Sequence, residues 1–81
     1  MDSELTIQVF YPYDQDAVVE FWCGDTLWAR VVENEPLLLL EIFPNPNGSA
    51  WVFPLDQVEN QLNQARRILA EERTEQLPSD R

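Results

Sequence analysis

The chain has 81 residues, a net charge of −10 and no histidine. This length allows one domain with one core, and 44% hydrophobic residues with nine aromatics exclude an acidic disordered protein. Eleven of the fifteen carboxylates but only one arginine, Arg30, lie in residues 1–65. A surface this acidic excludes direct binding to phosphate backbones and anionic membranes, which requires clusters of lysine and arginine.

The first third of the chain predicts a run of antiparallel strands. Apolar and polar residues alternate over residues 5–11, as in a half-buried strand, and Pro12 ends the pattern. A second β-branched and aromatic run covers residues 17–23. Gly24 and Asp25 then have the composition of a two-residue hairpin turn, which leads into a third strand.

A two-residue turn also predicts the register of this hairpin. Cys23 would lie opposite Thr26, and Phe21 opposite Trp28. The same alternation places Trp22 and Trp28 on opposite faces of the sheet, and it makes both faces apolar. Because one helix can cover only one face, we expect the other face to need a second source of cover.

Residues 33–36 predict a turn, and the apolar run that follows at 37–43 predicts a fourth strand. The run includes four consecutive leucines, but Pro36 before it and Pro44 after it favour a short strand over a helix. Asparagine, proline and glycine predict a loop over residues 44–48. Residues 50–53 predict a short fifth strand.

The last part of the chain predicts a helix over residues 56–72, with Asp56 as its N-cap and apolar residues at helical spacing. Residues 74–81 predict a flexible polar tail, and residues 1–73 a single domain. The fold class is therefore α+β: an antiparallel β-meander of four to five strands with one C-terminal helix packed on one face.

The residue types needed for catalysis or tight metal binding are scarce. The single cysteine, Cys23, has neither a disulfide partner nor a histidine base, so we interpret it as a structural residue of a strand. Asp14 and Asp16 lack the glycine and distal glutamate of a calcium loop. We therefore predict no catalytic residue, no metal and no cofactor, and a protein that is not an enzyme.

Charge and aromatic content favour a protein-binding module of the cytoplasm. The prediction is an inhibitor or neutraliser of a basic partner, in which carboxylates take the place of phosphates and an aromatic ring anchors the contact. Immunity proteins, antitoxins and nucleic-acid-mimicking inhibitors are similar to this chain in size, charge and aromatic content, without any shared motif. The predicted partner-binding residues are Tyr13, Asp14, Asp16, Glu20, Asp25, Trp28, Glu33 and Glu35.

The alternative is a homodimeric accessory or structural protein. In this interpretation the acidity serves solubility, and the uncovered aromatic face of the sheet forms the interface between two copies. The two interpretations differ in the dependence of binding on salt and in the mass of the particle in solution.

Overall fold

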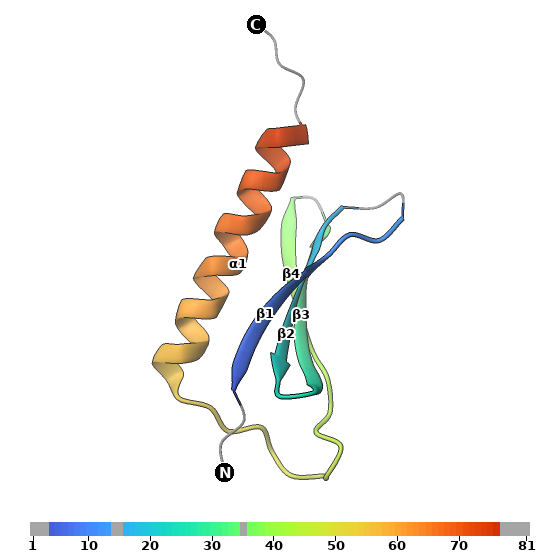
Figure 1. Ribbon diagram of the computed structural model, residues 1–81. Helices are drawn as coiled ribbons and strands as arrows, with labels where there is room; N and C mark the ends of the chain where they lie inside the picture. The colour runs from blue at the N-terminus through green and yellow to red at the C-terminus, as the bar shows by residue number, and fades with distance from the viewer. Residues whose placement is uncertain (1–3, 14–15, 35, 77–81) are drawn as a thin grey trace, which may run out of the picture.

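The fold is a four-stranded antiparallel sheet with one helix packed against it (Figure 1). This computed structural model describes residues 4–13, 16–34 and 36–76. The strands follow one another in the sheet as they do in the chain, in the order β1-β2-β3-β4. The α+β meander predicted from the sequence is confirmed. The elements are β1 Leu5–Phe10, β2 Val18–Cys23, β3 Thr26–Asn34, β4 Leu37–Ile42 and α1 Leu55–Gln76.

The β2–β3 hairpin has the predicted turn at its tip. Gly24 has a φ of 59°, which is in the left-handed region that glycine enters without a steric penalty. Its amide donates a hydrogen bond to the carbonyl of Glu4 at 2.9 Å, so the turn is also tied to the residue before β1. Cys23 faces Thr26, as predicted.

The register beyond the turn differs from the prediction because the ladder contains a β-bulge. Phe21 lies opposite Ala29 and not opposite Trp28, and the register shifts between Phe21 and Trp22. Trp28 is thus the extra residue of β3. A bulge can place two successive side chains on one side of the sheet, and both Trp28 and Ala29 belong to the core cluster. From Ala29 onward, the side chains of β3 lie on the faces opposite to those predicted.

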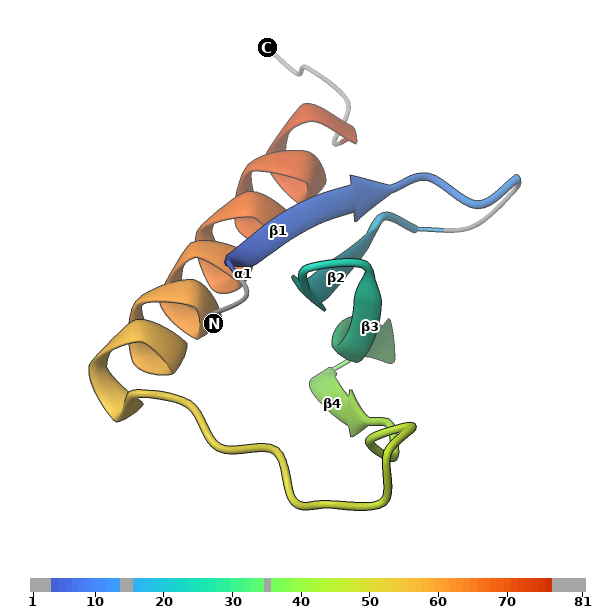
Figure 2. The ribbon, with the colours of Figure 1, turned by 60° about the horizontal axis from the view of Figure 1, so that its bottom comes forward.

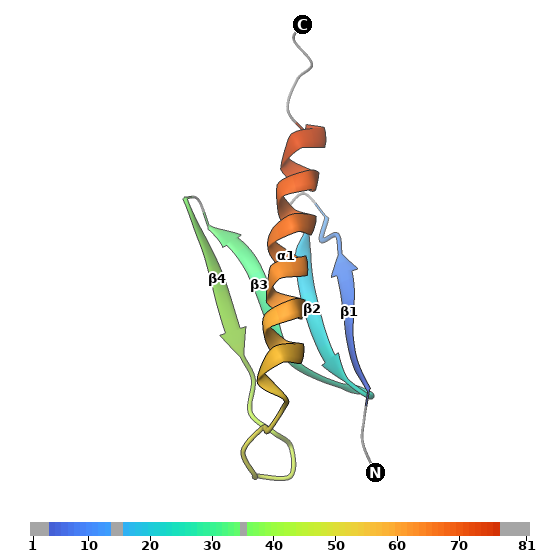
Figure 3. The same ribbon diagram turned by 90° about the vertical axis from the view of Figure 1, so that its left-hand side faces the viewer.

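The core lies between α1 and one face of the sheet. Ala65 and Leu69 of α1 are almost fully buried against a cluster that includes Val19 and Phe21 of β2. The helix therefore lies over the middle of the sheet, in front of β2 and β3 (Figure 3), and among the strands it packs most closely against β2. Seen from below, β4 stands well apart from α1 (Figure 2).

Helix α1 begins one residue before the predicted start and ends four residues after the predicted end. The carbonyl of Pro54 accepts hydrogen bonds from the amides of Gln57 and Val58 at 3.1 and 3.2 Å, so Pro54 precedes the first turn and Asp56 lies within it. The helix includes the first three residues of the predicted tail. The remaining tail residues, 77–81, lie outside the described residues.

The predicted fifth strand is absent from the described residues, because 43–54 form an irregular linker that leaves the sheet to reach the start of α1 (Figure 2). Side chains hold this linker in place. The Trp51 indole donates a hydrogen bond to the carbonyl of Phe43 at 2.9 Å. The rings of Trp51 and Phe53 stack at 5.6 Å, and the Phe53 ring lies 4.6 Å from that of Trp28.

Candidate protein-binding surfaces

The predicted site residues are distributed over the sheet and do not form one cluster. Asp16 precedes β2 and Glu33 is near the end of β3, so these two lie at the same end of the sheet. Asp25 lies in the β2–β3 turn at the opposite end, and Glu20 in the middle of β2. Tyr13, in the β1–β2 connection, is 95% exposed. Asp14 and Glu35 lie outside the described residues.

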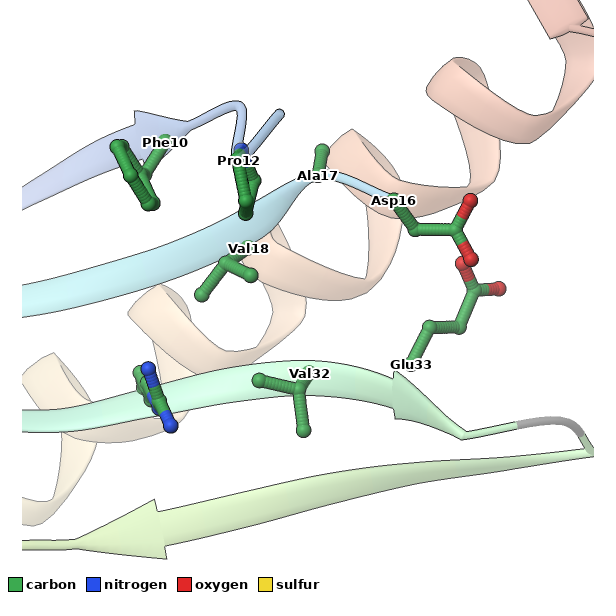
Figure 4. A pocket seen from close by; sticks show the side chains of 8 residues that line it. Phe10, Pro12, Asp16, Ala17, Val18, Val32 and Glu33 are labelled. Atoms are coloured by element: carbon green, nitrogen blue, oxygen red, sulfur yellow. The ribbon is translucent and has the colours of Figure 1, made fainter. Parts of the chain in front are cut away.

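Asp16 and Glu33 border a hollow of about 460 Å³ on the face of the sheet that points away from α1. Their carboxylates point toward one another (Figure 4). Apolar side chains from three segments form most of the remaining wall, and Arg30 lines it as well. These apolar residues are Phe10, Pro12, Ala17, Val18 and Val32. The hollow is therefore bordered by several apolar side chains, but polar atoms contribute more of its surface, and two acidic groups lie at its rim.

Arg30 does not supply a free positive charge to this hollow. Its guanidinium forms an ion pair with Glu41 of β4, with both side chains close to half exposed. It also lies 5.8 Å from the centre of the Phe43 ring, within the range of a cation–π contact. Arg30, the only arginine in the four strands, is therefore already paired with Glu41, which is not one of the two carboxylates at the rim.

Glu20 and Trp22 form a polar pair on the same outer face. The indole Nε1 of Trp22 donates a hydrogen bond to Oε1 of Glu20 at 3.2 Å, and both side chains are half-buried. Sequence reasoning separated Trp22 from Trp28 correctly, because these two side chains lie on opposite faces of the sheet.

Trp28 does not lie where a partner could use its ring as an anchor. It is only 5% exposed, and its ring contacts those of Phe21, Trp51 and Phe53. The β-bulge and the linker explain this burial, since the bulge directs Trp28 toward the helix layer and the linker covers it. Of the two aromatic anchors proposed from the sequence, only Tyr13 is exposed.

A second surface, which sequence reasoning did not single out, is formed by β4. All six of its residues are exposed, including Leu37 at 58% and Ile42 at 62%. An apolar groove continues from β4 toward the helix, with a hollow of about 420 Å³ at the linker end that Ile42 and Leu55 help to line. The signal in the sequence was the run of four leucines, but their exposure depends on where α1 packs.

The described residues gather no recognisable catalytic or metal-binding group. Cys23 is half-buried with a free thiol, and no three acidic, histidine or cysteine side chains of the described segments come close enough together to hold a metal ion. Neither is there, in the same residues, a helix with the length and apolar character needed to cross a bilayer.

Comparison with known proteins adds no functional assignment. No protein-family model, no curated protein and no solved structure matches this chain. The function therefore has to be argued from the two surfaces.

Proposed function

We propose that this chain is a small, non-enzymatic, cytoplasmic protein-binding module that inhibits or neutralises a basic partner. The observation that carries the proposal is the hollow with Asp16 and Glu33 at its rim and apolar side chains such as Val18 and Val32 beside them. The partner it fits best is a protein whose own ligand is negatively charged, such as a nucleic-acid-binding protein.

The hollow has the features that a basic side chain requires. Lysine and arginine bury their aliphatic stems against apolar surface while the charged head stays at a polar rim. Here the stem would lie against residues such as Val18 and Val32, and the head would reach the two carboxylates.

The charge of the whole chain supports the same partner. A net charge of −10 on 81 residues produces a long-range attraction for basic proteins, which speeds association and weakens as salt is added. Tyr13, at 95% exposure beside the acidic end, is available as an aromatic contact. Glu20 and Asp25, the other predicted carboxylates among the described residues, would contact the partner only if its interface extended beyond the hollow.

The test is a binding screen against a panel of purified basic nucleic-acid-binding proteins, with acidic proteins of similar size as negative controls. Association rates are measured by biolayer interferometry at about 0.05 M and about 0.5 M salt, which shorten the Debye length from about 14 to about 4 Å. We expect binding only to basic proteins, with an association rate that falls steeply at the higher salt concentration.

Two matched double variants test the role of the hollow. Asp16→Asn with Glu33→Gln removes both rim charges, and Asp56→Asn with Glu59→Gln removes two exposed charges of α1. We expect the first to slow association about tenfold and the second to have a much smaller effect. Equal losses in the two variants would refute the role of the hollow, and binding that is indifferent to salt would refute the electrostatic proposal.

A further inference from the structure

We infer that β4 is the interface between two copies of this chain, which pair antiparallel along their β4 edges into one continuous sheet. β4 is the last strand in the sheet order, so one of its edges has no neighbouring strand among the described residues. This inference is independent of the proposed function, because it concerns a different surface. Association of two copies should also strengthen as salt is added, whereas binding of a basic partner should weaken.

The hydrogen-bonding pattern identifies the backbone groups that are available at this edge. The amide of Phe43 donates to the carbonyl of Trp28 at 2.8 Å. Hydrogen-bonded pairs alternate along an antiparallel ladder, so the register places the peptide groups of Leu39 and Glu41 toward β3. The peptide groups of Leu38, Leu40 and Ile42 therefore point out of the sheet edge.

These outward groups define a single symmetric pairing. With a twofold axis perpendicular to the sheet at Leu40, Leu40 faces Leu40 of the second copy and Leu38 faces Ile42. All three outward residues of each copy are then used, which gives about six backbone hydrogen bonds between the copies. In this arrangement both helices lie on the same side of the joined sheet.

The charges recorded around β4 favour a second copy as the occupant. Glu41, the one charged residue of β4, forms an ion pair with Arg30 of β3. β4 therefore presents no unpaired carboxylate of its own in a chain whose net charge is −10. Two acidic chains can approach each other along this strand without placing its carboxylates unpaired against each other.

The exposed area of β4 would supply a large part of a dimer interface. The exposed fractions of its five aliphatic residues range from 38% to 62%, which corresponds to roughly 450 Å² per copy, distributed over both faces of the strand. This is about half of the roughly 800 Å² per partner of a standard interface. Edge strands normally carry charged side chains, proline or a bulge that prevents pairing. Leu37–Ile42 has neither proline nor a bulge, and its one charged residue, Glu41, is paired with Arg30.

The other edge strand, β1, lacks these properties. Its apolar residues Leu5, Ile7 and Val9 are buried or half-buried on the helix side, and they alternate with the exposed polar residues Thr6 and Gln8. Phe10, at the end of the strand, is the one apolar residue of β1 that is exposed. A second copy paired at β1 would bury little additional apolar surface. This contrast assigns the interface to β4.

The test measures the molar mass in solution over a range of protein concentrations by sedimentation equilibrium. We expect a dimer of twice 9.5 kDa at micromolar concentration, with tighter association as salt screens the repulsion between the copies. This dependence on salt is opposite in sign to that of the proposed basic partner, so failure of one proposal is distinguishable from failure of the other. A molar mass of 9.5 kDa at every protein and salt concentration would overturn the inference. β4 would then be available to pair with a strand of another protein.

Two variants of β4 and one control locate the interface. Leu40→Pro removes an amide that points away from β3, so it blocks pairing between copies and leaves the β3–β4 ladder intact. Leu40→Lys places a charge at the twofold axis, and Val52→Lys adds the same charge at a linker position that is 84% exposed. We expect both β4 variants to weaken dimerisation at least about tenfold and Val52→Lys to leave it unchanged. Circular dichroism confirms that each variant is folded.

Hydrogen exchange provides a readout that does not depend on variants. The amides of Leu38, Leu40 and Ile42 should become protected as the protein concentration rises, whereas those of Leu39 and Glu41 are protected by β3 at every concentration. A dimer that persists in both Leu40 variants, without concentration-dependent protection of these three amides, would place the interface elsewhere and overturn the inference.

Discussion

Trp28 and Trp51 lie side by side in the core, with ring centres 6.5 Å apart, but their indole N–H groups are in different situations. Trp51 donates to the carbonyl of Phe43 at 2.9 Å. The Nε1 of Trp28 is buried and has no acceptor among the described residues. A buried donor without an acceptor costs about 1–3 kcal/mol. Replacing each tryptophan by phenylalanine should therefore have unequal consequences.

The difference can be estimated from the two environments. Trp28→Phe loses about 1 kcal/mol of apolar burial, taking roughly 40 Å² at 25 cal/mol per Å². It also removes the unsatisfied donor, which regains about 1–3 kcal/mol, so the free energy of unfolding should be unchanged or should rise by up to about 2 kcal/mol. Trp51→Phe loses a similar ring area and a hydrogen bond worth about 0.5–1.5 kcal/mol, which gives a destabilisation of about 2 kcal/mol.

Urea unfolding followed by far-ultraviolet circular dichroism measures both variants without relying on tryptophan fluorescence. For an m-value of about 1 kcal/mol/M, the midpoint of Trp51→Phe should lie about 2–4 M below that of Trp28→Phe. Trp28→Ala serves as the control for burial, since losing the whole ring should cost about 3–5 kcal/mol. If Trp28→Phe unfolds at the same urea concentration as Trp51→Phe or a lower one, the reasoning from the unsatisfied donor is wrong.

Two further substitutions test the hairpin turn and the contact between helix and sheet. Gly24→Ala should destabilise the protein by about 1–2 kcal/mol in thermal unfolding, because Gly24 has a φ of 59°; an unchanged melting temperature would contradict this. Ala65→Leu should cost about 1–3 kcal/mol in urea unfolding, because Ala65 is 1% exposed in the core. Gln64→Leu, at an exposed position of the same helix, is its control, and equal midpoints for the two would show that the contact is loosely packed.

The features that follow from local patterns could be predicted from the sequence. The strands β1 to β4 and their meander order follow from three such patterns. These are the alternation in residues 5–11, the glycine at the hairpin tip and the prolines on both sides of the leucine run. The helix was predictable because its apolar residues recur every three or four positions. Only its ends were displaced, since Pro54 precedes the first turn in place of Asp56.

The features that depend on packing could not be predicted in the same way. The bulge at Trp28 has no signal of its own in the residues around it, and one extra residue reverses the faces of the rest of β3. Residues 50–53 have the composition of a strand, but the linker has to leave the sheet to reach α1. The exposure of β4 depends on where α1 lies over the sheet. Asp16 and Glu33 were each predicted, but only the fold brings them together.

The strand order has a consequence for the kinetics of folding. Because every pair of neighbouring strands is also consecutive in the chain, the sheet can form by successive hairpins without closing a long loop. The contact between α1 and β2 spans the linker and most of the chain, so it carries the largest entropic cost of closure. We expect the sheet to form early and the docking of α1 to complete the core late. Substitutions at Leu69 should then accelerate unfolding much more than they slow folding.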